Sequence, residues 1–165
     1  MRPSRILDAL DGLGDWRFVT CLWLARWPIV VPMDWVLSRF VQGYELPAIE
    51  AQDLAVVVAG AVVLSPLIET LVECALVYQV FKWLVWRDRR RPARSWPFMV
   101  MSALAMVLLH PLNAGPFAFT TGMFLAYCYG HFAAGSRLRA YVFTSLYHAG
   151  INTVGVTLIS LGIIS

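Results

Sequence analysis

The chain has 165 residues, of which 59% are hydrophobic and 14% are charged, and its mean hydropathy is +0.67. This composition is not that of an ordinary water-soluble domain and favours the lipid bilayer as the solvent. The net charge of +3 comes mainly from the basic run Arg87 to Arg94, which directly follows an apolar segment. That position indicates membrane orientation and argues against a nucleic-acid partner.

The N-terminus and the cysteines predict neither a cleaved leader nor a metal or redox motif. Where a signal peptide needs an uninterrupted apolar region, the chain carries Asp8, Asp11 and Asp15. We therefore expect no cleaved targeting segment. The three cysteines are far apart, lie among apolar residues and show no C-x-x-C spacing. They are predicted to be packing residues: Cys21, Cys74 and Cys128.

Five apolar stretches alternate with charged or turn-rich connections and set the predicted architecture. They cover residues 18–33, 54–86, 96–110, 116–130 and 141–164. We expect an all-α fold, a polytopic transmembrane helical bundle of about five membrane segments. It forms a single membrane domain over residues 1–165, in which residues 18–33 are the first membrane or interfacial helix.

Charged residues in the connections predict the orientation of the bundle. The basic ones fall on one side of the membrane if the N-terminus is cytoplasmic: Arg2, Arg5, the run Arg87 to Arg94, Arg137 and Arg139. The acidic ones then fall on the other side: Glu45, Glu50 and Asp53. This alternation predicts an integral, multi-pass protein of the inner or plasma membrane, with the N-terminus in the cytoplasm and the C-terminus outside.

Two of the stretches carry features that a simple span would not have. The first contains Arg17 and Arg26. An arginine in mid-span must snorkel or find a partner, so we expect this segment to lie partly in the interface. The second stretch, about 33 residues long, would measure about 50 Å as one straight helix, which is longer than a bilayer requires. A kink or boundary is therefore expected at Ser65–Pro66.

Ionisable and polar residues inside three of the stretches are the candidate functional residues. Glu69 and Glu73 are four residues apart in the second stretch, so they share one helix face. His110 ends the third stretch, before a run of proline, asparagine and glycine that should stop the helix. His148 and Asn152 share a face of the last stretch. Such residues usually face a protein interior and have a function, although structural hydrogen bonds between helices are the alternative.

Depth along the helices predicts that these residues form one cluster. At about 1.5 Å per residue, Glu73, His110 and Asn152 lie at similar depths from the cytoplasmic side, and Glu69 and His148 lie within about one turn of them. A carboxylate beside an imidazole can deprotonate water, while a second histidine and an asparagine can support an oxyanion. Alternatively, Glu69, His110 and His148 can hold a divalent metal such as zinc. Sequence spacing leaves both mechanisms open.

The residues near the two glutamates argue against a covalent mechanism. Ser65 and Cys74 are the candidate nucleophiles nearest to the glutamates, and neither has an adjacent base in sequence. The chain also contains no Gly-rich phosphate loop. We therefore expect water to be the nucleophile if the cluster is catalytic.

The pattern of these residues resembles the CAAX protease and bacteriocin-processing (CPBP, or Abi) family of intramembrane endopeptidases over residues 54–160. That family's first motif, E-E-x-x-x-R after a small residue and proline, is similar to Ser65 through Cys74, where Thr70 replaces the second glutamate and Cys74 the arginine. Its F-x-x-x-H motif resembles Met106 to His110 with methionine for phenylalanine, and its H-x-x-x-N motif is intact in His148 and Asn152.

The resemblance implies a role for each matched residue. Glu69 and His110 would activate the attacking water, and His148 and Asn152 would support the oxyanion. Glu73, at a position usually apolar in the family, is a candidate supporting residue that replaces the missing carboxylate or pairs with a buried donor.

The leading hypothesis is an intramembrane endopeptidase that cleaves a membrane-associated peptide or protein substrate. The alternative is a catalytically inactive homologue that serves as a structural or assembly subunit with other transmembrane subunits, because two positions of the first motif are lost. A proton- or ion-coupled carrier is a third class, weakened by the absence of inverted repeats.

Overall fold

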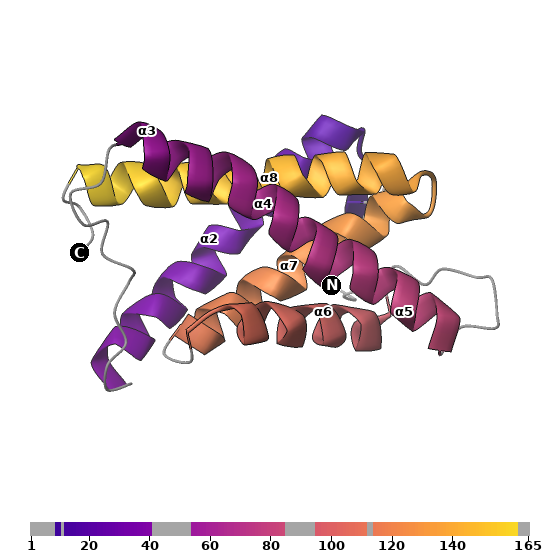
Figure 1. The fold of residues 1–165 in the computed structure, drawn as a ribbon, viewed down its shortest axis with the longest axis horizontal. Helices are drawn as coiled ribbons and strands as arrows, with labels where there is room; N and C mark the ends of the chain where they lie inside the picture. Colours follow the sequence, from indigo (N-terminus) through magenta and orange to yellow (C-terminus); the bar gives the residue numbers. More distant parts are fainter. Residues whose placement is uncertain (1–8, 11, 41–53, 85–94, 112–113, 162–165) are drawn as a thin grey trace.

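Every regular element in the described part of the chain is a helix. The computed structural model describes residues 9–10, 12–40, 54–84, 95–111 and 114–161. Its main helices are α2 (Asp15–Phe40), a long helix from α3 (Leu54–Val57) to α5 (Val77–Leu84), α6 (Trp96–Leu109), α7 (Gly115–Ala133) and α8 (Arg137–Ser160), shown in Figure 1. Each predicted apolar stretch corresponds to one of these helices. The all-α prediction is confirmed.

The long helix changes its winding twice, and a proline explains the first change. Within it, Val58–Leu64 (η1) and Thr70–Leu76 (η2) are π-helical, and Ser65–Glu69 (α4) between them is α-helical. At the end of η1 the hydrogen bond spans five residues, from the Ser65 N–H to the Gly60 carbonyl. The next N–H in that pattern would belong to Pro66, which has none. The winding therefore resets at Ser65–Pro66, where a boundary is predicted.

Two of the described helices are long and apolar enough to cross a membrane. They are Ala55–Leu84, with 30 residues, and Arg137–Ser160, with 24 residues. Helix α6 has only 14 residues, or about 21 Å, which is shorter than the hydrocarbon core of about 30 Å. Helix α2 is long enough but carries three arginines and two aspartates. The prediction of about five spans is thus supported for two helices.

The two spanning helices expose most of their apolar residues. In the most apolar window of each spanning helix, only 11% (Ala55–Leu84) and 28% (Arg137–Ser160) of the residues are buried. A core helix of a soluble protein would be mostly buried. Large apolar side chains such as Leu64, Ile68 and Leu71 point outward. Several polar side chains are buried beside the apolar core: Arg26, Thr70, Glu73, Ser102, Thr121, Thr144, Ser145 and His148. This distribution fits a lipid environment.

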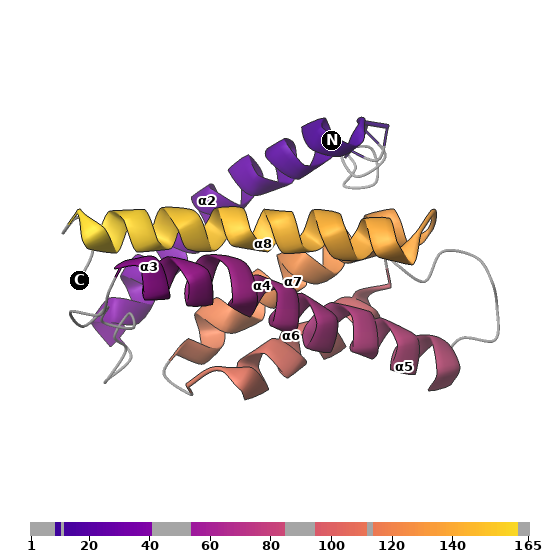
Figure 2. The ribbon, with the colours of Figure 1, turned by 45° about the horizontal axis from the view of Figure 1, so that its top comes forward.

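Successive helices run in alternating directions. In Figures 1 and 2, α2 begins, α5 ends, α6 begins and α8 begins at one end of the bundle, and their other ends lie opposite. A contact between Arg139 and Asp15, with Nε 2.9 Å from Oδ2, joins the starts of α8 and α2. Exposed tryptophans occur at both ends: Trp16, Trp83 and Trp96 at this end, and Trp35 near the end of α2. The basic run from 87 to 94 lies outside the described residues.

The cysteines agree only in part with their predicted packing role. Cys74 and Cys128 are buried free thiols, as predicted. Cys21 is also free but exposed, so the prediction is wrong for that residue. It lies on a face of α2 that no described helix covers.

Helices α6 and α7 approach each other closely at Gly122. A Cβ at this position would lie 2.7 Å from the Ala103 Cα and 3.1 Å from the Met106 Cβ. Small residues allow membrane helices to pack backbone against backbone in this way. We expect Gly122→Ala to destabilise the fold by about 1–3 kcal/mol because the helices must move apart.

Thermal unfolding of the purified protein in detergent measures this effect. Gly155→Ala on α8 is the matched control, since its Cβ would meet nothing within 4 Å. An unfolding temperature of Gly122→Ala equal to that of the control would contradict the close approach.

Candidate functional site

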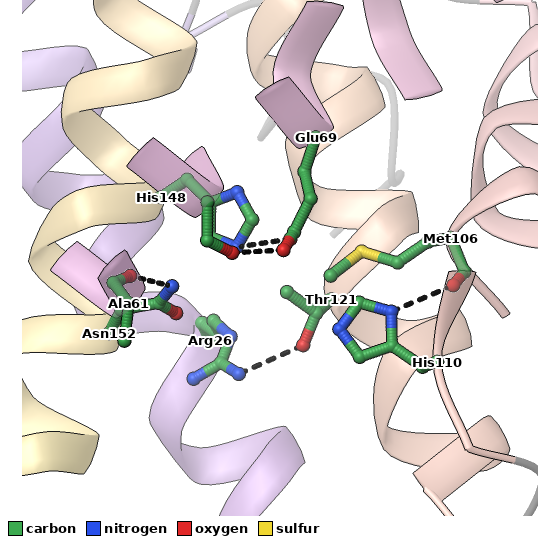
Figure 3. A network of polar contacts seen from close by, with 9 residues as sticks. Arg26, Ala61, Glu69, Met106, His110, Thr121, His148 and Asn152 are labelled. Atoms are coloured by element: carbon green, nitrogen blue, oxygen red, sulfur yellow. Dashed lines mark hydrogen bonds and ion pairs between the residues drawn. The ribbon is translucent and has the colours of Figure 1, made fainter. Parts of the chain in front are cut away.

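The Glu69 carboxylate and the His148 imidazole meet where the long helix lies against α8 (Figure 3). Glu69 Oε2 is 3.4 Å from His148 Nε2. The side chain of His148 is 2% exposed, whereas that of Glu69 is 19% exposed. The pair is therefore sheltered, yet the carboxylate remains accessible. These two residues, predicted from different stretches, are brought into direct contact.

Ser65 orients the other carboxylate oxygen of Glu69. It lies one helical turn earlier on α4, and its Oγ donates a hydrogen bond to Glu69 Oε1. Glu69 is thus held between a hydroxyl and an imidazole, which fixes the direction of its carboxylate. The sequence prediction placed Ser65 at the kink with Pro66 and considered its hydroxyl only as a nucleophile. Its spacing of four residues from Glu69 is the signal that would have assigned it this orienting role.

Asn152 binds the backbone of the long helix. Its Nδ2 donates to the Ala61 carbonyl at 2.7 Å. In the π-helical pattern that carbonyl would accept from Pro66, which has no N–H, so the carboxamide supplies the donor that the helix cannot. The position differs from the predicted depth, because Asn152 lies level with Ala61 and not with Glu73. The π-helix and the tilt of the helices shift the register from that of straight rods.

This pairing predicts that Asn152 and Pro66 are energetically coupled. Asn152→Ala should destabilise the protein by about 1 kcal/mol, because the Ala61 carbonyl loses its donor inside the bundle. In a Pro66→Ala background the backbone regains an N–H, so the same substitution should cost less. Thermal or denaturant unfolding of the two single variants and the double variant measures the coupling. Additive effects would contradict this account.

His110 lies just beyond α6, as predicted from the turn residues that follow it. The helix ends at Leu109, and His110 has extended backbone angles of φ −114° and ψ 157°. Its Nδ1 is 2.8 Å from the Met106 carbonyl. Because a carbonyl only accepts, we assign the proton to Nδ1, which leaves Nε2 as an acceptor. No contact joins His110 to Glu69 among the described residues.

Arg26 is buried between α2 and α7 and was not predicted as a site residue. It is 0% exposed, and its NH2 group donates to Thr121 Oγ1 at 2.9 Å. The rings of Trp27 and Phe117 each lie 5.2 Å from its guanidinium carbon. A mid-span arginine was expected either to snorkel or to find a partner, and Arg26 finds partners. The cost of burying such a charge was the sequence signal for a functional role.

Glu73 lies one turn beyond Glu69 and is fully buried. Neither of its carboxylate oxygens has a hydrogen-bond partner among the described residues. The His148 imidazole is instead in contact with Glu69. The carboxylate closest to the histidine is therefore the one that matches the first motif, and Glu73 stays a candidate supporting residue.

The predicted metal ligands do not gather into a metal site. Within the described residues, no group of three or more His, Cys, Asp or Glu side chains is arranged to hold a metal ion. Glu69 and His148 make contact, but the contact of His110, which lies just beyond α6, is with the Met106 carbonyl. The geometry therefore does not fit the metal alternative with Glu69, His110 and His148, and no metal is included in the mechanism below.

Comparisons with known proteins add no further constraint on the site. The chain matches no protein-family model, no curated protein and no solved structure. The resemblance of its motifs to the CPBP family thus rests on the residues named above.

Proposed function

We propose that the chain is an intramembrane endopeptidase of CPBP type. The observation that carries the proposal is the contact of Glu69 with His148 inside an otherwise apolar bundle. A carboxylate and an imidazole on different helices are costly to bury in a membrane protein, so their contact there indicates a functional site. A membrane-associated peptide or protein is the proposed substrate.

In this proposal the Glu69 carboxylate and the His110 Nε2 hold the attacking water. Glu69 has the exposure to reach it, and the hydrogen bond at the His110 Nδ1 leaves Nε2 as an acceptor. Glu69 takes the water proton as the oxygen attacks the scissile carbonyl, and later returns a proton to the departing amine. Ser65 and His148 keep the carboxylate in position.

The proposal also includes the orientation of the chain in the membrane. We infer that the remaining helices also lie in the bilayer of an inner or plasma membrane, with the N-terminus in the cytoplasm and the C-terminus outside. The alternating helix directions, which put the start of α2 and the end of α8 at opposite ends of the bundle, support opposite sides for the two termini. Reporter fusions at the two termini test it, and reporters active on the same side would overturn it.

The experiment for the activity compares membranes of cells that express the wild-type chain or Glu69→Gln. New protein N-termini are labelled chemically and identified by mass spectrometry. We expect cleavage sites in membrane-associated proteins that depend on Glu69. Identical sets of N-termini in the two samples would overturn the proposal.

A second candidate is a catalytically inactive subunit of a membrane protein complex. It is favoured by the first motif, where Thr70 and Cys74 replace a glutamate and an arginine and are both buried. In that case Glu69→Gln and wild-type chains should co-purify with the same transmembrane partners and support the same function.

A further inference from the structure

A groove lies between the two helices that are long and apolar enough to cross a membrane. Figures 1 and 2 show the long helix and α8 close together as far as α4 and diverging toward the end of the bundle where α8 begins. The groove opens in this diverging part and has a volume of about 350 Å³. It is lined by η2 and α5 on one side and by the start of α8 on the other, with the buried Tyr129 of α7 as its floor.

The walls of the groove are apolar and exposed. Leu71 and Leu76 on the long helix and Leu138 on α8 line it, and they are 48%, 53% and 72% exposed. One turn further along α8, the Tyr141 hydroxyl donates a hydrogen bond to the Leu67 carbonyl at 3.0 Å, which ties α8 to the long helix. The groove is therefore held in shape at its inner end and can accept an apolar chain from the lipid side.

Two polar side chains line the same groove. Arg137 is the first residue of α8, Gln79 lies on α5, and both are exposed. Arg139 is paired with Asp15, whereas no carboxylate is paired with Arg137 in the part of the chain that the structure describes. The Arg137 guanidinium thus offers a positive charge and a planar fork of N–H donors, which match the oxygens of a phosphate. The Gln79 carboxamide can add another N–H.

The position of these two side chains along the bundle fits a lipid headgroup. They lie at the end of the bundle where Trp16, Trp83 and Trp96 are exposed. Tryptophan is enriched where the membrane meets water, at the level of the headgroups. Trp83 is one turn beyond Gln79 on α5, so the polar part of the groove is close to that level.

We propose that the groove binds an anionic phospholipid, with the headgroup phosphate at Arg137 and one acyl chain along the leucine walls. Basic pockets between transmembrane helices on the cytoplasmic side bind anionic lipids, and the proposed orientation places the start of α8 on that side. A partner helix is too large an occupant, since a helix about 10 Å wide takes up about 400 Å³ for each turn. The inference requires the chain to lie in a bilayer but does not depend on endopeptidase activity.

Photoreactive lipids test this site with the full chain reconstituted in phosphatidylcholine vesicles. The vesicles contain a trace of one probe, either phosphatidylglycerol or phosphatidylcholine, with a diazirine in one acyl chain. Labelled peptides are mapped by mass spectrometry. We expect the anionic probe to label residues 71–79 about fivefold more than the neutral probe. Arg137→Gln should remove most of this preference, and Arg137→Lys should retain most of it. A protein without peptidase activity should give the same result.

Three controls separate the groove from general attraction of anionic lipids. Ala75→Phe fills the groove without changing the charge and should also remove the preference; if it does not fold, Leu71→Gln at an exposed wall position replaces it. Arg17→Gln, an exposed arginine near the start of α2, should leave the preference unchanged. Soluble glycerol phosphate should not compete.

Three results would overturn the proposal. The first is equal labelling of residues 71–79 by the two probes in the wild-type protein. The second is a preference that survives in Arg137→Gln or falls equally in Arg17→Gln, since either would mean that the charge in the groove is not what selects the lipid. The third is competition by glycerol phosphate, which would assign the groove to a free phosphate ester.

Discussion

Replacing Glu69 by glutamine is expected to slow peptide cleavage by about 1,000-fold or more. Glutamine has nearly the same shape and can still accept the hydrogen bond from Ser65. Its amide cannot take a proton from water, so the attacking group is not activated. The measurement is the initial rate of cleavage of a mapped peptide by purified protein in detergent micelles.

Glu73→Gln provides the internal comparison for this variant. It removes a carboxylate of the same size one turn away, at a position that is fully buried. Because His148 faces Glu69 and not Glu73, we expect the rate to stay within about tenfold of wild type. If Glu73→Gln abolished cleavage while Glu69→Gln did not, the role of general base would pass to Glu73.

The second large effect is expected for His148→Leu, with a loss of about 1,000-fold in the cleavage rate. The imidazole faces Glu69 Oε2 at 3.4 Å, and a leucine would leave that oxygen with no donor from α8. Leucine fills much of the same buried volume, so the fold should persist. Thermal unfolding of the same sample separates lost activity from lost structure.

His131→Leu is the matched control for His148→Leu. His131 lies on α7 and stacks on Phe18 with ring centroids 3.7 Å apart, so its substitution changes an aromatic contact on a different helix. Cleavage should continue at a rate close to wild type. Equal losses in both variants would indicate a general disturbance of the bundle and would contradict a specific role for His148.

The helices were predictable because apolar runs and their terminators are local signals. The turn residues after His110 placed the end of α6 correctly, and Pro66 marked the change of winding in the long helix. Local signals could not give the number of spans. The length of α6 depends on where its first turn begins, and at 14 residues it falls short of a bilayer.

The contact between Glu69 and His148 was predicted in outline, because polar residues in separate spans tend to face one another. Its register was not predictable, since two π-helical segments alter the rise and rotation of the long helix. For the same reason, the partner of Asn152 proved to be a backbone carbonyl. The Ala61 carbonyl can be recognised as lacking a backbone donor only once the winding around Pro66 is known.

Arg26 shows a different limit of sequence reasoning. The free-energy cost of placing the Arg26 charge in a membrane was evident from the sequence. The sequence could not tell whether the side chain would snorkel outward or turn inward. The choice depends on tertiary contacts, namely the Thr121 hydroxyl and the ring of Phe117, which both come from α7. No spacing rule connects positions that are 95 residues apart.

The most direct test of the central claim uses the purified chain alone, reconstituted in lipid vesicles with a mapped peptide in water enriched in oxygen-18. We expect the wild-type protein to cleave the peptide and to place one heavy oxygen in the new C-terminal carboxyl, while Glu69→Gln gives no product. Absence of cleavage by the pure, folded wild-type protein would contradict an endopeptidase and would favour a subunit that acts only within a larger complex.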